Sequence, residues 1–339
     1  MNNISSNIRS PIFIKKRYNF YNNWYKKTIY HSYNPSLLII LLMILCKFII
    51  FILNLYLINS YNLKICLCTL GKNENKYAIE FVEHYKKYGI DKIFIYDNNE
   101  ITGEKFETVL SEYIKSNFIE LIDYRGKKKI QLKILNHCYQ NNYKKYDWII
   151  LFDMDEFIFL KNHRKIKNYL INKKFQDCKV IYLNEIIHLD NNKIYYENKT
   201  LSERFKSVDL NTNQLMVKSI IRGNLENINI TNNHVIDLKF SMKTCNANGK
   251  KPILKGIHLL NPDIQNYYFD HYYYKSCEEY LEKLKRGSCF WGNSRAINLL
   301  WLSHFFSRNK ITIEKINYFE NKTGIILKDL RKKMNNDLT

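Results

Sequence analysis

The chain has 339 residues, of which 46% are hydrophobic and 15% aromatic, and only 10 are Gly and 4 are Pro. This composition excludes a disordered or fibrous protein and predicts a globular domain with a sizeable core. Lys and Arg together number 53 against 32 Asp and Glu, which gives a formal net charge of +21. The lysines are spread over the whole chain, so the charge alone does not indicate a nucleic-acid-binding surface.

The first feature along the chain is an apolar segment over residues 37–58, interrupted by Lys47 and a few polar residues. About 20 apolar residues span a bilayer, so the segment predicts a transmembrane anchor over residues 36–59, with a buried core helix as the alternative. The arm of residues 1–35 is basic, and no acidic residue precedes Glu74. By the positive-inside rule we expect a single-pass type II membrane protein of the Golgi or ER, with the rest of the chain in the lumen.

Glycosylation sequons and cysteines bear on the same compartment. Three sequons follow the predicted anchor, at Asn198, Asn229 and Asn321, as expected for a lumenal domain. Of the 8 cysteines, Cys46 lies in the anchor and seven follow it. Disulfides are therefore possible, and the odd number leaves at least one thiol free.

Beyond the anchor, short apolar strands alternate with amphipathic helices. The predicted strands cover residues 64–70, 92–96, 118–122, 148–152 and 179–183. The predicted helices lie around residues 78–89, 106–114 and 130–143, and a capping box at Ser276 starts another that ends at Gly287. This alternation predicts an α/β domain with a mostly parallel central sheet over residues 60–330, followed by a charged tail over residues 331–339.

Two carboxylates follow the apolar strand 148–152 directly. Asp153 and Asp155 are spaced by one residue, so both can approach one divalent ion at the end of the sheet. Ligands of open α/β sheets gather at this end, where a nucleotide diphosphate would lie. Hard oxygen ligands suit Mn2+ or Mg2+, and the alternative is a solvated turn.

Other polar residues follow neighbouring strands. Asp97 is suited either to accept hydrogen bonds from a base or ribose or to bend the chain, and Arg125 is suited to neutralise phosphate. His271 precedes the capped helix, with Lys275 nearby. This histidine is either structural or suited to ligate a metal or meet a leaving phosphate.

The motifs in their order along the chain resemble those of glycosyltransferase family 92 and its relatives in family 2, from about Lys64 to about Gly292. The residues that carry the resemblance are Lys72-Asn-Glu74, Glu80 to Gly89, Ile95-Tyr-Asp-Asn98, Gln131, Asn136-His-Cys138, Phe152-Asp-Met-Asp-Glu-Phe157, Glu203-Arg-Phe205, Lys218-Ser-Ile-Ile-Arg222, His271-Tyr, Lys275-Ser and Lys285-Arg-Gly287. Each motif alone is weak, whereas the ordered set is specific.

The resemblance implies a GT-A fold, an α/β/α sandwich, with a UDP-sugar donor and a glycan or glycoconjugate acceptor. It implies Mn2+ (or Mg2+) held by Asp153, Asp155 and His271, and the donor-binding residues that it implies are Asn73, Glu74, Asp97, Arg125, Gln131, Asp153 and Lys275. It also implies metal-dependent transfer of a hexose, with galactose as the first candidate, and with inversion.

The acceptor side departs from the family pattern at residues 184–190, so the general base stays open among Glu185, Asp190 and Glu156. One alternative function is that of another metal-dependent sugar-nucleotide enzyme, such as a nucleotidyltransferase. It lacks support because no Gly-rich phosphate loop follows the first strand. Another alternative is a non-enzymatic basic membrane protein that binds nucleic acid or anionic lipid, although no recognition motif accompanies the charge, and no nucleic acid partner is expected.

Overall fold

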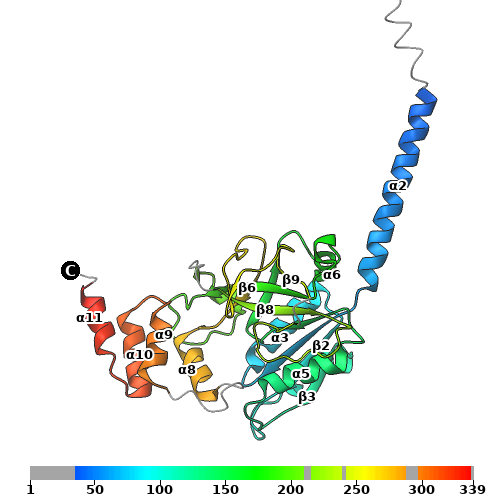
Figure 1. Ribbon diagram of the computed structural model, residues 1–339. Coiled ribbons are helices and arrows are strands. Elements are labelled where there is room, and N and C mark those ends of the chain that lie inside the picture. Colours follow the sequence, from blue (N-terminus) through cyan, green and yellow to red (C-terminus); the bar gives the residue numbers. More distant parts are fainter. Residues whose placement is uncertain (1–34, 210–214, 239–241, 288–296, 337–339) are drawn as a thin grey trace, which may run out of the picture. The chain divides into compact units, whose positions relative to one another are not determined.

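The structure is a computed structural model that describes residues 35–209, 215–238, 242–287 and 297–336 (Figure 1). It divides into two units, residues 1–61 and 62–339. The first unit includes most of helix α2 (Pro35–Asn62). Among the described residues, no helix is both long enough and apolar enough to cross a bilayer, so the anchor predicted over residues 36–59 is not supported. Nearly all of the basic arm lies outside the described residues.

The second unit begins with strands that alternate with helices. Strands β1 to β4 pair in the order β3-β2-β1-β4, and each of these pairs is parallel. The elements are β1 (Ile65–Gly71), α3 (Asn75–Tyr88), β2 (Lys92–Asp97), α4 (Glu107–Lys115), β3 (Ile119–Asp123), α5 (Gln131–Asn142) and β4 (Trp148–Leu151). This half of the sheet confirms the predicted alternation of strands and helices.

Helices cover both faces of these parallel strands. Alternate residues of a strand point to opposite faces, so Leu67 packs in one core cluster with Phe81 of α3, whereas Cys68 packs in another with Ile134 of α5. A disulfide between Cys68 and Cys138 ties β1 to α5 on that second face. The strands are buried on both sides, which explains their continuous apolar sequences.

The rest of the sheet is mixed, which corrects the expectation of a mostly parallel sheet. The order continues from β4 as β8-β6-β12-β5, where only the β6–β12 pair is parallel. The long strands of this half are β5 (Glu156–Leu160), β6 (Val180–His188), β8 (Leu215–Arg222) and β12 (Tyr267–His271). The remaining elements are α6 (Ile166–Leu170), η1 (Lys173–Phe175), α7 (Leu201–Arg204), β7 (Val208–Asp209), β9 (Thr244–Asn246), β10 (Leu254–Lys255) and β11 (His258–Leu259).

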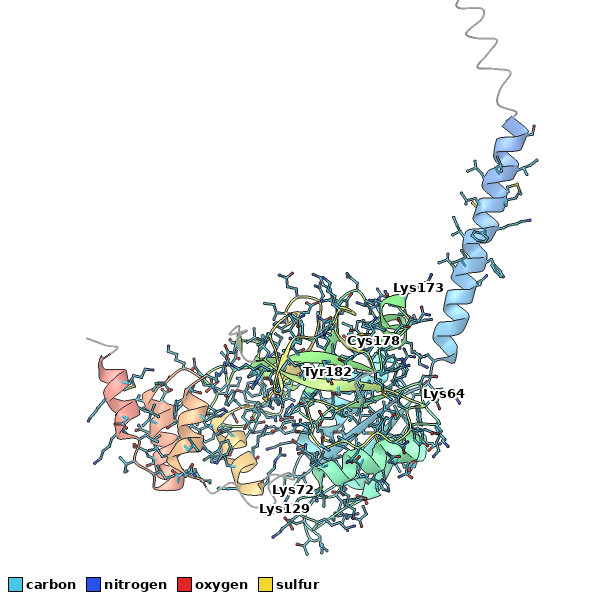
Figure 2. The ribbon with its side chains drawn as sticks, in the orientation of Figure 1. Lys64, Lys72, Lys129, Lys173, Cys178 and Tyr182 are labelled. Atoms are coloured by element: carbon cyan, nitrogen blue, oxygen red, sulfur yellow. A yellow bond between two sulfur atoms is a disulfide. The ribbon has the colours of Figure 1, made fainter. Side chains whose placement is uncertain are left out.

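A second disulfide joins Cys178, just before β6, to Cys245 of β9, and Cys178 is labelled in Figure 2. The sequence anticipates disulfides in general but not these pairs. Among the described cysteines, Cys46, Cys66 and Cys277 are free, in agreement with the expected leftover thiol.

In the described part of the chain, four helices follow the sheet, coloured from yellow to red in Figure 1. They are α8 (Cys277–Arg286), α9 (Leu299–Phe306), α10 (Ile313–Thr323) and α11 (Lys328–Asn336). The predicted capping box is present, because the Ser276 hydroxyl accepts from the Glu279 amide and the Glu279 side chain accepts from the Ser276 amide. The helices share a third core cluster. Residues 331–336, predicted as part of a charged tail, belong to α11.

Candidate active site

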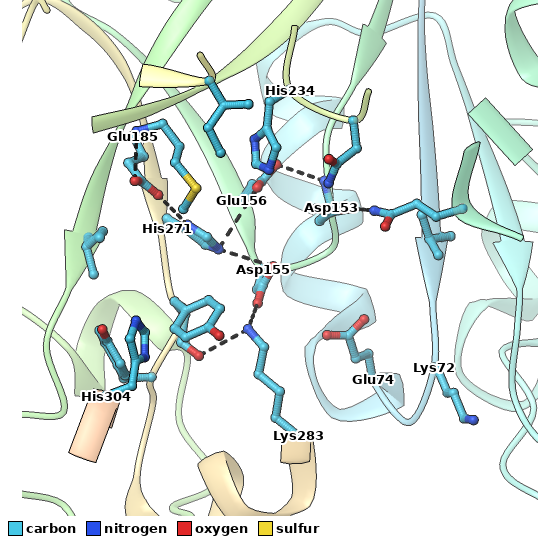
Figure 3. Close-up of a pocket in the computed structure, with 18 of the residues that line it drawn as sticks. Lys72, Glu74, Asp153, Asp155, Glu156, Glu185, His234, His271, Lys283 and His304 are labelled. Carbon is cyan, nitrogen blue, oxygen red and sulfur yellow. Dashed lines mark hydrogen bonds and ion pairs between the residues drawn. The ribbon is translucent and has the colours of Figure 1, made fainter. Parts of the chain in front are cut away.

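A pocket of 630 Å³ opens where β1 and β4 end, between Leu70 and Asp153, and it extends to side chains of β6, β8, α8 and α9 (Figure 3). The site residues predicted from the sequence that line this pocket are Glu74, Gln131, Asp153, Asp155, Glu156, Glu185 and His271. Residues far apart in the sequence thus meet at the end of the sheet where ligands of α/β folds bind.

The Asp153-Met-Asp155 turn connects β4 to β5 and brings both carboxylates to the pocket. Asp153 forms an ion pair with Lys218 of β8 through Oδ2, while its Oδ1 has a long contact of 3.4 Å with Gln131 Nε2. Asp155 Oδ2 accepts from Lys283 Nζ at 2.8 Å and from Lys275 Nζ at 3.5 Å. Each carboxylate therefore has one oxygen held by lysine.

The charge of Asp155 is strongly favoured. Burial alone would raise the pKa of this carboxyl, but Lys283, Lys275 and His271 outweigh burial and hold the pKa well below its usual range. The opposite holds for the neighbouring Glu156, where burial, Asp153 and Asp155 together raise the pKa to about 7 despite the attraction of Lys218. Two adjacent carboxyl groups therefore differ in how readily they accept a proton.

His271, the last residue of β12, is fixed by a hydrogen bond from its ring. Its Nδ1 lies 2.8 Å from Glu185 Oε2, and the second oxygen of Glu185 accepts from the Met216 amide at 2.9 Å. Metal ligation would require the ring to carry its proton on Nδ1 alone, and the lone pair of Nε2 would then face Asp155 Oδ1, 3.8 Å away. A carboxylate that orients a histidine in this way is the usual support of a metal-ligating imidazole.

These atoms provide part of a metal site. Among the described residues, no three His, Cys, Asp or Glu side chains converge closely enough to hold a metal by themselves. The 3.8 Å between His271 Nε2 and Asp155 Oδ1 is a separation that an ion can bridge, and carboxylate oxygen suits Mn2+ while imidazole nitrogen suits other divalent transition metals. The residues present therefore fit a divalent ion whose remaining ligands come from outside the protein.

A cationic wall, defined here as Lys72, Lys283 and Arg286, lines the pocket beside Glu74. Arg286 Nη1 lies 2.9 Å from Glu74 Oε1 and also donates to the backbone oxygen of Lys72. Lys283 and Arg286 are spaced by three residues, so one face of α8 presents both. This wall places fixed positive charge next to Asp155.

One known protein family matches most of the sequence. The sequence profile described as Glycosyltransferase family 92 matches residues 61–331, which is most of the chain. The chain belongs to glycosyltransferase family 92.

Individual relatives are distant. A family 92 protein of Ricinus communis is 28% identical over 106 residues, which are 31% of this chain and 18% of the relative. A family 92 protein of Arabidopsis thaliana is 29% identical over 103 residues, 30% of this chain and 17% of the relative. The matched segment thus spans less than a fifth of the length of either relative.

Solved structures give only weak likenesses. A mannosyltransferase of Pyrobaculum calidifontis in complex with GDP-Man and Mn2+ matches with a TM-score of 0.29 and 7% identity over 35% of each chain. The S. aureus protein TarS matches with a TM-score of 0.33 and 10% identity over 76% of this chain and 48% of its own. At these scores the likenesses carry no argument about the present site.

Several residues predicted for the family 92 site lie outside the lining of this pocket. Asp97 is fully buried, where it accepts from the Asn99 amide at 2.9 Å and lies 3.4 Å from Arg125 Nε. Asn73 has a left-handed backbone, with φ 53°, and its amide donates to the Asn99 side chain. Lys275 is buried behind Asp155, where its Nζ lies 4.7 Å from the centre of the Tyr77 ring.

Asp190 also lies outside the pocket lining. Its Oδ2 forms a buried ion pair with Lys315 of α10, and its amide donates to the Asn309 side chain at 2.8 Å. Both members of the pair are shielded from solvent. The arrangement gives Asp190 a structural role, so it drops out of the three candidates for the general base.

Three residues that pair with carboxylates of this pocket were not among the site residues predicted from the sequence: Lys218, Lys283 and Arg286. Lys218 is 2% exposed, and its Nζ contacts Asp153 and also Glu156 Oε1 at 3.2 Å. It lies in the Lys218-Ser-Ile-Ile-Arg222 motif, and Arg286 lies in the Lys285-Arg-Gly287 motif, so the family motifs carried the signal. The spacing of Lys283 from Arg286 on the capped helix is the physical signal that was available.

Proposed function

We propose that the chain is a metal-dependent glycosyltransferase that moves a hexose from a UDP-sugar to a hydroxyl of a glycan or glycoconjugate, with inversion and with galactose as the first candidate. The observation that carries the proposal is the arrangement around Asp155. One of its oxygens faces His271 Nε2, while lysines of the α8 region hold the other. We propose a GT-A fold on the basis of the parallel strands that deliver Asp153 and Asp155 to this place.

The cationic wall is suited to the diphosphate of the donor. Lys283 and Arg286 sit next to one another on α8, and Lys72 adds a third cation at the end of β1. A diphosphate bridged between a sugar and a nucleoside carries two negative charges, which fixed cations stabilise as they shift to the leaving group. Lys275 supports this wall from behind by its contact with Asp155.

Asp155 and His271 would hold the metal directly, and Asp153, the third ligand predicted from the sequence, would reach it through water, because three such side chains do not converge among the described residues. When bound, the divalent ion supplies neutralisation of the charge that grows on the departing diphosphate. Glu185 keeps the His271 ring in the ligating orientation through Nδ1. Gln131, the first residue of α5, lies near the Oδ1 atom of Asp153 and would contact either Asp153 or the donor.

In the transfer step, the oxygen of the acceptor hydroxyl forms a bond to the anomeric carbon. The bond from that carbon to the diphosphate oxygen breaks, and its electron pair leaves with the UDP. The hydroxyl proton passes to a carboxylate, for which Glu156 and Glu185 are the candidates that line the pocket. Attack from the face opposite the diphosphate inverts the anomeric centre.

Release of UDP by the protein, measured over a panel of UDP-hexoses with and without Mn2+, tests this function. We expect one donor to be turned over, and only with the metal. A protein that neither turns over nor binds any of these donors in the presence of Mn2+ would contradict the donor and the metal assignment together.

We also propose that the domain works in the lumen of the Golgi or ER. The support comes from the disulfides Cys68–Cys138 and Cys178–Cys245, because such bonds persist in oxidising compartments. The sequon residues Asn198, Asn229 and Asn321 are all exposed. Treatment of the protein from its own cells with an N-glycosidase should raise its electrophoretic mobility. The triple Asn→Gln variant, without treatment, should migrate faster than the untreated unsubstituted protein. Equal mobility of these two untreated proteins would contradict the lumenal location.

A further inference from the structure

We infer that the pocket holds the terminal sugar ring of the acceptor on an aromatic wall, defined as Tyr273, Trp301 and His304; the inference rests on the proposed transferase function. All three residues line the pocket. In Figure 3 His304 lies on one side of Asp155 and Lys283, and Lys72 lies on the other side. The aromatic wall and the cationic wall thus flank the same carboxylate.

Ring contacts connect the aromatic wall to the proposed metal ligand. The Tyr273 ring centre lies 5.5 Å from that of His271 and 5.9 Å from that of His304, both nearly edge to face. The Trp301 ring centre follows 6.0 Å beyond His304. This series of rings leads from His271, beside Asp155, to α9, so the wall begins next to the proposed reacting centre.

Helix α9 holds its part of the wall on a packed core. Leu302 and Phe305 are fully buried, and the Phe305 ring lies 5.1 Å from that of Phe319 in α10. Trp301 and His304, three residues apart, lie on the more exposed side of the same helix. The buried face therefore fixes the position of the face that lines the pocket.

The chemistry of the wall favours an uncharged sugar. Arg308, which also lines the pocket, forms an ion pair with Asp209. Lys283 Nζ lies 3.8 Å from the centre of the Tyr273 ring, and the proposed function assigns it to the diphosphate of the donor. Neither of these two cations is therefore left for an anionic group of the acceptor. A pyranose presents a C–H face, which packs on aromatic rings, and hydroxyl edges, which bond to polar atoms at the ring margins.

A nucleoside base also stacks on aromatic rings, but the position argues against it here. Nucleotides of α/β sheets bind at the ends of the parallel strands, which this pocket meets at Leu70 of β1 and at Asp153 after β4. The aromatic wall instead comes from the segment after β12 and from α9, beyond the mixed half of the sheet. This separation assigns the wall to the acceptor.

Saturation-transfer NMR with the methyl β-glycosides of glucose, galactose, mannose and N-acetylglucosamine, in the presence of UDP and Mn2+, tests the inference on the full chain. We expect transfer to the ring protons of at least one glycoside, with an affinity about tenfold lower in Trp301→Ala. The matched control is Tyr195→Ala, since Tyr195 is 62% exposed and lies outside the pocket lining. UDP affinity, measured by calorimetry, should be the same in all three proteins.

Two results would overturn the inference: UDP binding without any glycoside signal, or weaker UDP binding in Trp301→Ala with the glycoside signal intact. The second result would assign the wall to the nucleoside. Failure of the unsubstituted chain to bind UDP would count against the proposed function instead. The glycoside signals, recorded without UDP, would then still decide the role of the wall.

Discussion

Different interactions hold the cationic wall and the aromatic wall of the pocket in place. On the charged side, buried or partly buried ion pairs fix each group, as in Asp153 with Lys218 and Glu74 with Arg286. On the aromatic side, edge-to-face ring contacts and the packing of α9 set the geometry. Removing one partner of a buried ion pair leaves an uncompensated charge, whereas removing one ring of a half-exposed wall loses only contact area.

This difference separates the two tasks of a transferase. The chemistry at the diphosphate is the same for every acceptor and tolerates little change in charge. On the proposed acceptor side, which would decide the hydroxyl that is presented, we expect the rings to be replaceable without disturbing the ion pairs. We therefore expect substitutions on the charged side to remove turnover, and substitutions on the aromatic wall to change acceptor selection at nearly constant stability.

The largest expected effect is that of Asp155→Asn on turnover. The carboxylate has a strongly favoured charge and faces both His271 and Lys283, so its loss removes the proposed metal ligand and an anchor for the cationic wall. We expect kcat for UDP release with Mn2+ to fall about 10²–10³-fold. Asp177→Asn is the matched control, because the Asp177 side chain is 74% exposed. Turnover within tenfold of the unsubstituted chain would contradict the role of Asp155.

The second-largest expected effect is that of Lys283→Met on UDP affinity, which tests the cationic wall alone. A hydrogen bond between charged groups contributes about 1.5–3 kcal/mol, so UDP affinity should weaken about tenfold to hundredfold. Lys285→Met on the same helix is the control, since Lys285 is exposed and does not line the pocket. Calorimetric titration with UDP measures both variants. Equal dissociation constants would remove Lys283 from the donor site.

The sequence predicts features that depend on local patterns, whereas it does not predict contacts between residues far apart in the chain. Strands β1 to β4 and their helices follow from local periodicity, and Asp153 and Asp155 follow from their place after β4. His271 was recognisable, but its contact with Glu185 joins residues that are 86 apart in the chain. The lysine partners of the two aspartates lie 65 and 128 residues away, beyond the reach of any local pattern. The partner of Asp190 was out of reach for the same reason, because only the packing of α10 reveals Lys315.

A third prediction concerns the stability of the fold at low pH, to which Glu279 of α8 contributes. Burial would raise the pKa of Glu279, but hydrogen bonds from Arg204, Ser276 and Tyr77 outweigh it and lower the pKa to about 2. A lowered carboxyl pKa stabilises the folded state above the unfolded value of about 4.3, and that stability is lost as pH falls toward 2. The shift corresponds to ~3 kcal/mol at neutral pH.

Urea unfolding between pH 2.5 and 7 measures this contribution. We expect the free energy of unfolding to fall with acidification more steeply in the unsubstituted chain than in Glu279→Gln, which lacks the titrating group. Glu112→Gln is the control, because the Glu112 side chain is 79% exposed and forms only a surface pair with Lys115. Parallel acid profiles for the unsubstituted chain and Glu279→Gln would show that this carboxyl does not govern acid stability.

The smallest expected effect is on the stability contributed by the aromatic wall. Trp301 is half-buried at the pocket, so Trp301→Ala should lower the free energy of unfolding by only about 1 kcal/mol. Phe305→Ala, one helical turn away and fully buried in the core of α9, should cost about 3–5 kcal/mol. Urea unfolding of the two variants gives the comparison directly. If Trp301→Ala cost as much as Phe305→Ala, the ring would be part of the core, and the aromatic wall could not vary independently of the fold.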